Sequence, residues 1–217
     1  MAIQSASEHL SLTGRSDRSM RIGLFGGTFD PPHIGHLVLA AEALVQMHLK
    51  SLFWVLTPDP PHKKEQVITD VGIRIAMVKA MINGFPEFTF SDIEFKRPGP
   101  HFAADTVREL KHDFPDAQIF YLLGGDSLND LPGWHSPADF VHACAGIIVM
   151  QRVNEKPDWK LLDQKLPELR RKTHFLKTPI IEISSNDIRE RVKQDRPWRP
   201  YVNAGVEKII QESNIYK

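Results

Sequence analysis

The chain has 217 residues, of which 41% are hydrophobic and 25% charged, so it is long enough and apolar enough to bury one sizeable core. Basic and acidic side chains both number 27, which excludes the overall positive field that nonspecific binding to nucleic acid or to anionic membranes requires. No apolar run approaches the roughly 20 residues of a membrane span, and the one cysteine, Cys144, excludes an internal disulfide, so we expect a cytoplasmic protein.

Residues 1–20 are rich in serine and contain Glu8 and Asp17, but they hold no continuous apolar segment. They resemble neither a secretory signal nor a transit peptide. We therefore expect a disordered tail over 1–20 and a single domain over 21–217. Met20 lies directly before the first apolar run and is an alternative to Met1 as the translation start.

The first predicted strand is the apolar run 22–25, and it ends in Gly26 and Gly27. Asp30 and the two prolines that follow it disfavour helix, so they hold a loop open until a long helix begins, predicted over 37–49. Such a helix start offers backbone N–H groups and a partial positive charge to phosphate oxygens.

Two histidines lie at this helix start. His33 and His36 are three residues apart, on one side of a first helical turn, and Gly35 leaves space between their rings. Both imidazoles can therefore face one anion. The competing interpretation is that one histidine caps the helix and the other is a half-buried core residue.

The stretch 26–36, Gly-Gly-Thr-Phe-Asp-Pro-Pro-His-Ile-Gly-His, resembles the signature of the His-x-Gly-His nucleotidyltransferases. It is most similar to that of the bacterial nicotinate mononucleotide adenylyltransferases. The resemblance implies a Rossmann-like α/β fold, a mostly parallel central sheet with helices on both faces, and transfer of AMP from ATP to a nucleotide phosphate. It also implies Mg²⁺ as the cofactor, carried mainly by the ATP phosphates, with no metal site made by the protein.

The same resemblance implies roles for the residues of this stretch. Gly26, Gly27 and both histidines bind ATP, and the histidines also act in catalysis, His36 by stabilising the transition state. Thr28 orients the incoming phosphate of nicotinate mononucleotide, and Asp30 contributes to binding that substrate.

Leu52 to Leu56 form a second buried strand, so a strand, helix, strand unit is complete. Such a unit makes parallel strands, which leaves the carboxyl end of the first strand as a ligand crevice. The proline-rich segment 58–65 is a projecting loop, where Lys63 can reach a phosphate or remain a solvated basic tip. Asp59 stands where members of the resembled family commonly have asparagine.

The middle of the chain is predicted to contain a helix over 72–82 with methionines in the core, a half-buried edge strand over 88–95, and a helix over 101–112. At the start of the last helix the family usually has Ser-Tyr-Thr, whereas this chain has His-Phe-Ala. We expect the backbone N–H groups of Ala103 and Ala104 to receive the substrate carboxylate.

A buried strand over 117–123 ends in Gly124 and Gly125, directly before Asp126. Asp126 can accept hydrogen bonds from ribose hydroxyls, or it can simply cap a helix that begins at residue 127. The resemblance favours ATP binding for Gly124 and Asp126. It also implies that Trp134 stacks on the pyridine ring and that His135 contributes its backbone.

Beyond a strand over 144–150 lies Arg152, which can bind the substrate phosphate or form a surface salt bridge. The segment 154–178 has leucines at helical spacing and a basic run, 170–172, which we interpret as complementing the dipole of its own helix.

A last strand is predicted over 179–183, followed by a capped helix that carries Arg189. Hydroxyls, N–H groups and a guanidinium meet at this helix start, so it is a second anion site. The segment resembles the family's Ile-Ser-Ser-x-x-Ile-Arg motif, with Asn186 in place of threonine or serine and still able to cap. The resemblance implies ATP binding by Ser184, Ser185 and Arg189, the last also in catalysis.

Three alternatives to adenylyl transfer onto nicotinate mononucleotide are open. A sibling transferase acting on phosphopantetheine or on choline or glycerol phosphate shares the histidine motif but usually lacks the features around Lys63 and Trp134 together. A dehydrogenase would require the spaced Gly-x-Gly-x-x-Gly turn, which is absent at 23–27. A noncatalytic nucleotide sensor would lack His36 or Arg189. The oligomeric state and the preference for the acid over the amide form of the substrate do not follow from the sequence.

Overall fold

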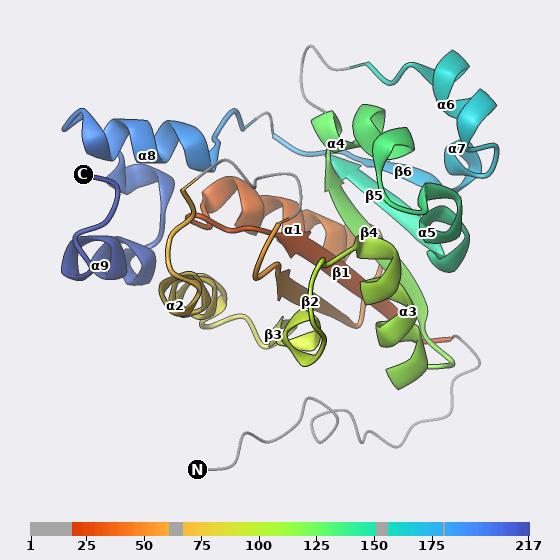
Figure 1. Cartoon of the computed structure of the whole chain (residues 1–217), viewed down its shortest axis with the longest axis horizontal. Helices are drawn as coiled ribbons and strands as arrows, with labels where there is room; N and C mark the ends of the chain where they lie inside the picture. Colours follow the sequence, from red (N-terminus) through yellow and green to blue (C-terminus); the bar gives the residue numbers. More distant parts are fainter. Residues whose placement is uncertain (1–18, 61–66, 151–155, 180) are drawn as a thin grey trace.

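The structure, a computed structural model, describes residues 19–60, 67–150, 156–179 and 181–217. Its centre is a sheet of six strands in the order β3-β2-β1-β4-β5-β6, in which every neighbouring pair is parallel. Helices lie on both sides of this sheet (Figure 1), so the expected Rossmann-like α/β fold is confirmed. The strands are β1 (Arg21–Gly27), β2 (Ser51–Leu56), β3 (Phe88–Ser91), β4 (Gln118–Gly124), β5 (Gly146–Met150) and β6 (Thr173–Leu176).

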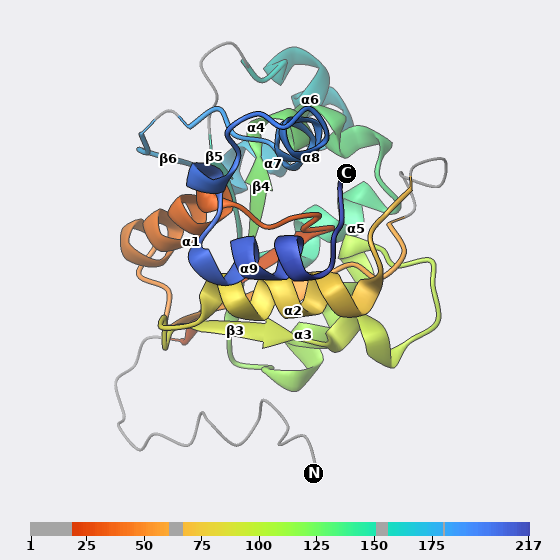
Figure 2. The same ribbon diagram turned by 90° about the vertical axis from the view of Figure 1, so that its left-hand side faces the viewer.

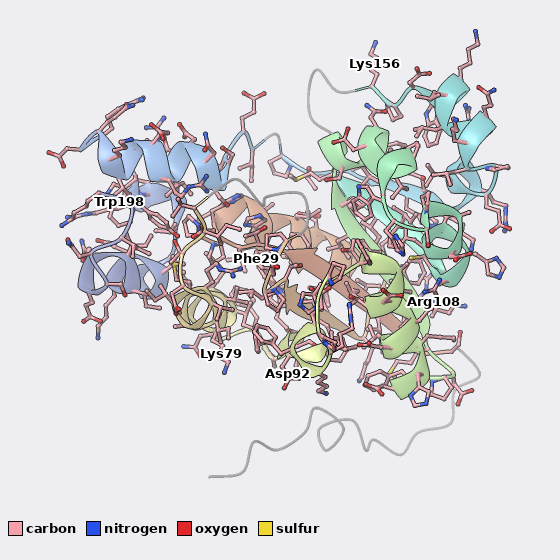
Figure 3. The ribbon with its side chains drawn as sticks, viewed as in Figure 1. Phe29, Lys79, Asp92, Arg108, Lys156 and Trp198 are labelled. Carbon is pink, nitrogen blue, oxygen red and sulfur yellow. The ribbon has the colours of Figure 1, made fainter. Side chains whose placement is uncertain are left out.

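The helices divide between the two faces because their buried side chains join two separate core clusters. One face is covered by α1 (Ile34–Gln46), α2 (Val71–Ile82), α8 (Ser185–Lys193) and α9 (Ala204–Glu212). The other is covered by α3 (Ala103–Asp113), α4 (Gly125–Asp130), α5 (Pro137–Ala143), α6 (Trp159–Lys165) and α7 (Leu169–Lys172). Figure 2 shows α9 lying along α2, and Figure 3 shows Trp198 on the side that carries α8 and α9.

The apolar runs of the strands follow from burial on both faces. Along β2, Leu52 and Trp54 join the cluster under α1, whereas Phe53 and Val55 join the cluster under α3. Side chains alternate across a strand, so a parallel strand covered on both faces must be apolar at every position. This is why the continuous runs at β1, β2, β4 and β5 predicted those strands correctly.

The predicted strand over 88–95 is too long. The strand ends at Ser91, and Ile93–Lys96 form a short 3₁₀ helix that turns Glu94 into the interior, where it is 4% exposed. The polar and apolar alternation continues past the strand because a 3₁₀ turn can also bury every third residue. The predicted position at the sheet edge is confirmed, because β3 is the first strand in the order and, among the described strands, pairs with β2 alone.

The predicted strand over 179–183 is wrong. Residue 180 lies outside the described residues, and the structure assigns no strand to residue 179 or to 181–183. The sixth strand is instead β6, which lies within the segment predicted as helical. Ile183 still packs against the core, so the apolar residues of 181–183 are explained by packing without a strand.

The basic run 170–172 does not simply complement its own helix. Lys172 Nζ donates to the carbonyls of Val141, His142 and Cys144, each at 2.9 Å, at the end of α5. These are carbonyls that lack intrahelical partners, so Lys172 caps a neighbouring helix. Cys144 itself is 1% exposed, as expected of a buried cysteine.

Candidate active site

Several of the predicted site residues within the described chain lie at or directly after the carboxyl ends of β1 and β4, which are neighbours in the sheet. From β1 the chain continues to β2 on one side of the sheet, whereas β4 leads to β5 on the other. The point at which strand order reverses opens a crevice at the carboxyl edge of a parallel sheet, and ligands of such folds bind there. Gly26 and Gly27 end β1 at this point, and Gly124 ends β4.

The first wall of the crevice is the start of α1. The helix begins at Ile34 rather than at Leu37, so His33 is its cap residue and His36 lies in its first turn. His36 N–H donates to His33 Nδ1 at 3.3 Å, and His33 N–H donates to His36 Nδ1 at 3.2 Å. This reciprocal pair is a capping box made by two histidines. The capping interpretation is therefore correct for His33.

Capping does not remove these histidines from phosphate chemistry. Because Nδ1 of each ring accepts a backbone N–H, the proton of each neutral imidazole is on Nε2, which is then a hydrogen-bond donor. The two rings are stacked with centroids 3.6 Å apart. The space beside Gly35 is not empty as expected, since His33 Nδ1 lies 3.0 Å from where a Cβ of Gly35 would be.

The ring of His36 is also fixed by aromatic neighbours. Its centroid is 5.6 Å from that of Phe25 and 5.2 Å from that of Phe29, both in edge-on arrangements. Phe29 itself has a φ of 50°, a left-handed conformation that costs a non-glycine residue about 1–2 kcal/mol. The buried ring of Phe29, near the middle of the molecule in Figure 3, offsets that cost by packing on Phe25 and Trp54.

The second wall is the start of α8. Ser184 is the cap residue, and its hydroxyl accepts from Asp187 N–H at 3.0 Å. Asn186 does not cap, contrary to expectation, because it lies inside the helix and its Oδ1 accepts from Arg189 Nη2 at 3.0 Å. Ser185 Oγ donates to the carbonyl of Pro31, so a phosphate contact of Ser185 would come from its backbone N–H.

The two helix starts are joined to each other. Ser185 Oγ donates to Pro31 O and Arg189 Nη1 donates to Asp30 O, both at 2.8 Å, across more than 150 residues of sequence. The structure thus brings together the two predicted anion sites at one loop. Contact of either with ATP stays a prediction.

Within the described residues, the guanidinium of Arg189 has no carboxylate partner. Both of its hydrogen-bond acceptors, Asp30 O and Asn186 Oδ1, are neutral. Arg191, two residues further along α8, is instead paired with Asp187 at 2.7 Å. A guanidinium held by neutral oxygens can bind an anion without first breaking an ion pair.

The loop between β1 and α1 is fixed by hydrogen bonds of two buried residues, Asp30 and Arg74. Asp30 is 5% exposed, and its oxygens accept from Tyr216 Oη at 2.5 Å and from Thr69 N–H at 3.2 Å. These contacts give Asp30 a role in holding the loop, while its contact with substrate stays a prediction. Thr28 is half-buried, and its carbonyl accepts from Arg74 Nη1 at 3.1 Å.

Arg74 is a site residue that sequence reasoning missed. It is 2% exposed, and besides Thr28 O it donates to the carbonyls of Thr69, Thr57 and Pro58. It therefore ties the loop after β1 to the loop after β2. Burial lowers the pKa of Arg74, and the nearby Asp30 opposes that shift. The available signal was its position on the same helix face as the buried Met77 and Met81.

The predicted pyridine site lies on the other side of β1 and β4. Ala103 and Ala104 are the first residues of α3, whose first-turn N–H groups have no intrahelical acceptor. Trp134 is half-buried and packs against Tyr121 and Phe140, with centroids 6.4 Å and 5.4 Å away. His135 stacks on Phe102 at 4.0 Å, so its ring joins the start of α3 to the loop after α4.

Gly26 is required for a reason that the sequence did not reveal. A Cβ at this position would collide with the hydroxyl of Tyr121, which reaches across from β4. The two residues are diagonal neighbours, since Leu24 is the register partner of Tyr121. The absence of a side chain at Gly26 therefore leaves space for the hydroxyl of Tyr121.

Two of the predicted site residues, Lys63 and Arg152, lie outside the described residues. Asp126 lies inside α4, whose cap is Gly124, so the alternative that Asp126 is the helix cap is wrong. Among the described residues no group of three or more histidine, cysteine, aspartate or glutamate side chains is arranged to hold a metal ion. In the same part of the chain no helix is long and apolar enough to cross a membrane.

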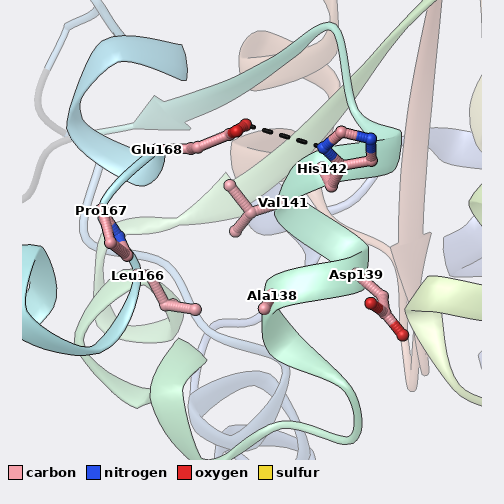
Figure 4. Close-up of a pocket in the computed structure, with 7 residues that line it drawn as sticks. All are labelled: Ala138, Asp139, Val141, His142, Leu166, Pro167 and Glu168. Carbon is pink, nitrogen blue, oxygen red and sulfur yellow. Dashed lines mark ion pairs between the residues drawn. The ribbon is translucent and has the colours of Figure 1, made fainter.

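A separate hollow lies away from this crevice, between α5 and the turn that joins α6 to α7 (Figure 4). Its walls include Val141 and Leu166, and His142 Nδ1 lies 3.9 Å from Glu168 Oε2 at its rim. None of the predicted site residues that the structure describes is among its lining residues.

A parallel sheet whose switch point carries two joined helix starts, with histidines on one and an arginine on the other, defines a nucleotide-binding transferase of the Rossmann-like class. In agreement, the family described as cytidylyltransferase-like matches residues 24–191. A probable nicotinate-nucleotide adenylyltransferase of Shouchella clausii is 39% identical over 200 residues, covering 90% of this chain and 96% of its own. The nicotinate-nucleotide adenylyltransferase of Bacillus subtilis is 34% identical, covering 91% and 98%. The chain belongs to the nicotinate-nucleotide adenylyltransferase family.

Solved structures agree on the fold. A Plasmodium falciparum nicotinic acid mononucleotide adenylyltransferase, solved as a complex with APC, superposes with a TM-score of 0.74 at 20% identity and covers 91% of this chain and 97% of its own. A putative nicotinate-nucleotide adenylyltransferase from Vibrio parahaemolyticus has a TM-score of 0.62 at 17% identity, covering 91% and 95%.

Proposed function

We propose that this chain transfers AMP from ATP to the phosphate of nicotinate mononucleotide, giving nicotinic acid adenine dinucleotide and pyrophosphate, a step of NAD biosynthesis. The observation that carries the proposal is the junction of the two helix starts, where Ser185 and Arg189 donate to the carbonyls of Pro31 and Asp30. A triphosphate held there meets N–H groups from two helices and one guanidinium, all preorganised before it binds.

The reaction requires no nucleophile from the protein. An oxygen of the mononucleotide phosphate attacks the α-phosphorus of ATP, and the bond from that phosphorus to the bridging oxygen of the β-phosphate breaks. Pyrophosphate leaves with the electron pair of that bond. Catalysis is then a matter of in-line positioning and of neutralising the charge that builds up on the leaving group.

The described residues fit these tasks. Nε2 of His36 is a donor on a ring fixed by Phe25 and Phe29, and Arg189 adds a positive charge at Asp30, in the loop that leads into the same helix. His33 and the first turn of α8 hold the ATP phosphates, together with Gly124 and Asp126 at the end of β4. Thr28 orients the attacking phosphate.

Mg²⁺ fits this site as an ion carried by the substrate. The described residues include no cluster of metal ligands, and both carboxylate oxygens of the buried Asp30 accept from protein donors. Hard oxygen ligands from a triphosphate suit Mg²⁺. When bound, the ion would neutralise phosphate charge beside Arg189 and His36.

The acceptor would lie on the other side of β1 and β4. The indole of Trp134 is held by Tyr121 and Phe140 and offers its face to a pyridine ring. The N–H groups of Ala103 and Ala104 face a carboxylate, and His135, Asp30, Lys63 and Arg152 complete the proposed contacts with nicotinate mononucleotide.

The test is pyrophosphate release with ATP and Mg²⁺ against nicotinate mononucleotide, its amide analogue and phosphopantetheine in parallel. We expect the first acceptor to give the highest kcat/KM, and His36→Ala to lower it by about 100-fold or more. Activity with phosphopantetheine alone would reassign the chain to the sibling transferases. If no pyrophosphate is released with any of the three acceptors although the protein binds ATP, the chain would be a nucleotide sensor.

A further inference from the structure

Asp30 is contacted by three segments that are distant in sequence. Tyr216 Oη donates to its Oδ1 at 2.5 Å, and Thr69 N–H donates to its Oδ2 at 3.2 Å. Its backbone carbonyl accepts from Arg189 Nη1 at 2.8 Å. One buried residue therefore links the segment after α9, the segment before α2 and helix α8.

The carboxylate of Asp30 and the guanidinium of Arg189 are close but not paired. No ion pair in the described part of the chain joins them, although Arg189 bonds the carbonyl of the same residue. An aspartate and an arginine this near would ordinarily form a charge-assisted pair. The two donors on the Asp30 oxygens are what hold the carboxylate in its present direction.

Tyr216 is suited to act as a permanent donor. Burial raises its pKa above the ordinary value and the charge of Asp30 adds to that shift, so the hydroxyl keeps its proton at neutral pH. The field of Asp30 acts on the buried Arg74, which it helps to keep protonated. The negative charge of Asp30 thus compensates the buried positive charge of Arg74. It forms no ion pair with Arg189 in the described chain, so the charge of Arg189 is not neutralised by this carboxylate.

We infer that Tyr216 is a positioning residue for the transfer reaction: by binding Asp30 Oδ1, it keeps that carboxylate from pairing with Arg189, so that the guanidinium remains available to the ATP phosphates. The inference rests on the proposed function, since it assigns Arg189 to ATP. It assigns to Tyr216 a role that acts through its hydrogen bond to Asp30.

The test compares Tyr216→Phe with Tyr201→Phe, Asp30→Asn and the double variant Asp30→Asn with Tyr216→Phe. Tyr201 is a matched control, because it is a half-buried tyrosine of the same region whose hydroxyl makes no hydrogen bond within the described chain. ATP affinity is measured by calorimetry without acceptor, kcat and KM are measured with acceptor, and thermal unfolding is followed for each protein.

We expect Tyr216→Phe to weaken ATP binding and to lower kcat/KM by about tenfold, because the released carboxylate can turn to Arg189. Tyr201→Phe should match the wild type. The double variant should be no worse than Asp30→Asn alone, since the neutral amide cannot neutralise a guanidinium. If Tyr216→Phe acted only by lowering stability, its loss would instead add to that of Asp30→Asn in the double variant.

Two results would overturn the inference. The first is wild-type ATP affinity and turnover in Tyr216→Phe. The second is a double variant in which the two losses multiply. Failure of the proposed function has a different signature, namely a wild-type protein that binds ATP but releases no pyrophosphate with any acceptor, and in that case the ATP affinities of the variants still decide the role of Tyr216.

Discussion

Arg74 and Arg189 carry the same guanidinium group but use it in opposite ways. Arg74 is buried, and its N–H groups donate to the carbonyls of Thr28, Thr57, Pro58 and Thr69. Among the described residues, Arg189 donates to two neutral acceptors, so its charge is not paired with a carboxylate there. The first holds the loops in place, and the second is placed by those loops.

Replacing Arg74 should therefore affect stability. In Arg74→Met the carbonyls of the two loops lose their donors while the volume is nearly kept, and we expect the free energy of unfolding to fall by about 3–5 kcal/mol. Lys79→Met is the control, because Lys79 is an exposed cation on the same helix. Urea denaturation measures both, and an equal, small loss in the two variants would contradict the assigned role.

At the residue scale the sequence predicted the position of residues at helix starts better than it predicted their contacts. The histidines and Arg189 were predicted to bind phosphate because their types and spacing at a helix start suit an anion, and that role stays a prediction. The capping box of His33 and His36 was only one of two open interpretations, since a histidine nitrogen can cap and bind at the same helix start. Arg74 was missed because an arginine on an apolar helix face has no partner visible in the sequence.

At the element scale, the length and the burial of each strand determined whether the sequence predicted it correctly. β1, β2 and β4 are central strands covered on both faces, so their apolar runs were unambiguous. β6 is a four-residue edge strand with Phe175 40% exposed, and such a short, partly polar stretch gives little periodicity. The run 179–183 was mistaken for it because apolar residues that pack in a loop look like a strand.

The helix starts show the same limit. Serine, asparagine and aspartate follow one another near 184–187, and all three residue types can cap a helix. The structure selects Ser184 and places Asn186 on Arg189 instead. Composition thus predicted a capped helix with an anion site, and only the three-dimensional arrangement identified the residue that caps it.

At the scale of the whole molecule, the sequence could not give the contacts that assemble the site. The bonds from Ser185 and Arg189 to the loop after β1 span more than 150 residues, and the bond from Tyr216 to Asp30 spans 186. Such pairings depend on the packing of α8 and α9 on the sheet. The resemblance predicted that both helix starts serve one substrate, but not the bonds that join them.

Burial of Cys144 makes global stability depend on pH. Burial raises the pKa of its thiol to about 12, and Lys172 opposes the shift. The unfolded thiol loses its proton near its ordinary pKa of 9.0, while the folded one retains it, so this contribution to stability is lost as pH rises above about 9. In Cys144→Ala the free energy of unfolding should fall less between pH 8 and pH 10, by about 1 kcal/mol. Identical pH dependence in denaturant titrations of the two proteins would contradict this burial.

The most direct test of the joined helix starts compares the turnover of Arg189→Met with that of Arg191→Met, using ATP, Mg²⁺ and nicotinate mononucleotide. The two arginines lie on the same helix, but Arg191 is already paired with Asp187. We expect Arg189→Met to lower kcat/KM by about 100-fold to 1,000-fold, and Arg191→Met to change it by about twofold at most. Near-normal turnover in Arg189→Met, or equal losses in both variants, would contradict a site built at the junction of α8 with the loop after β1.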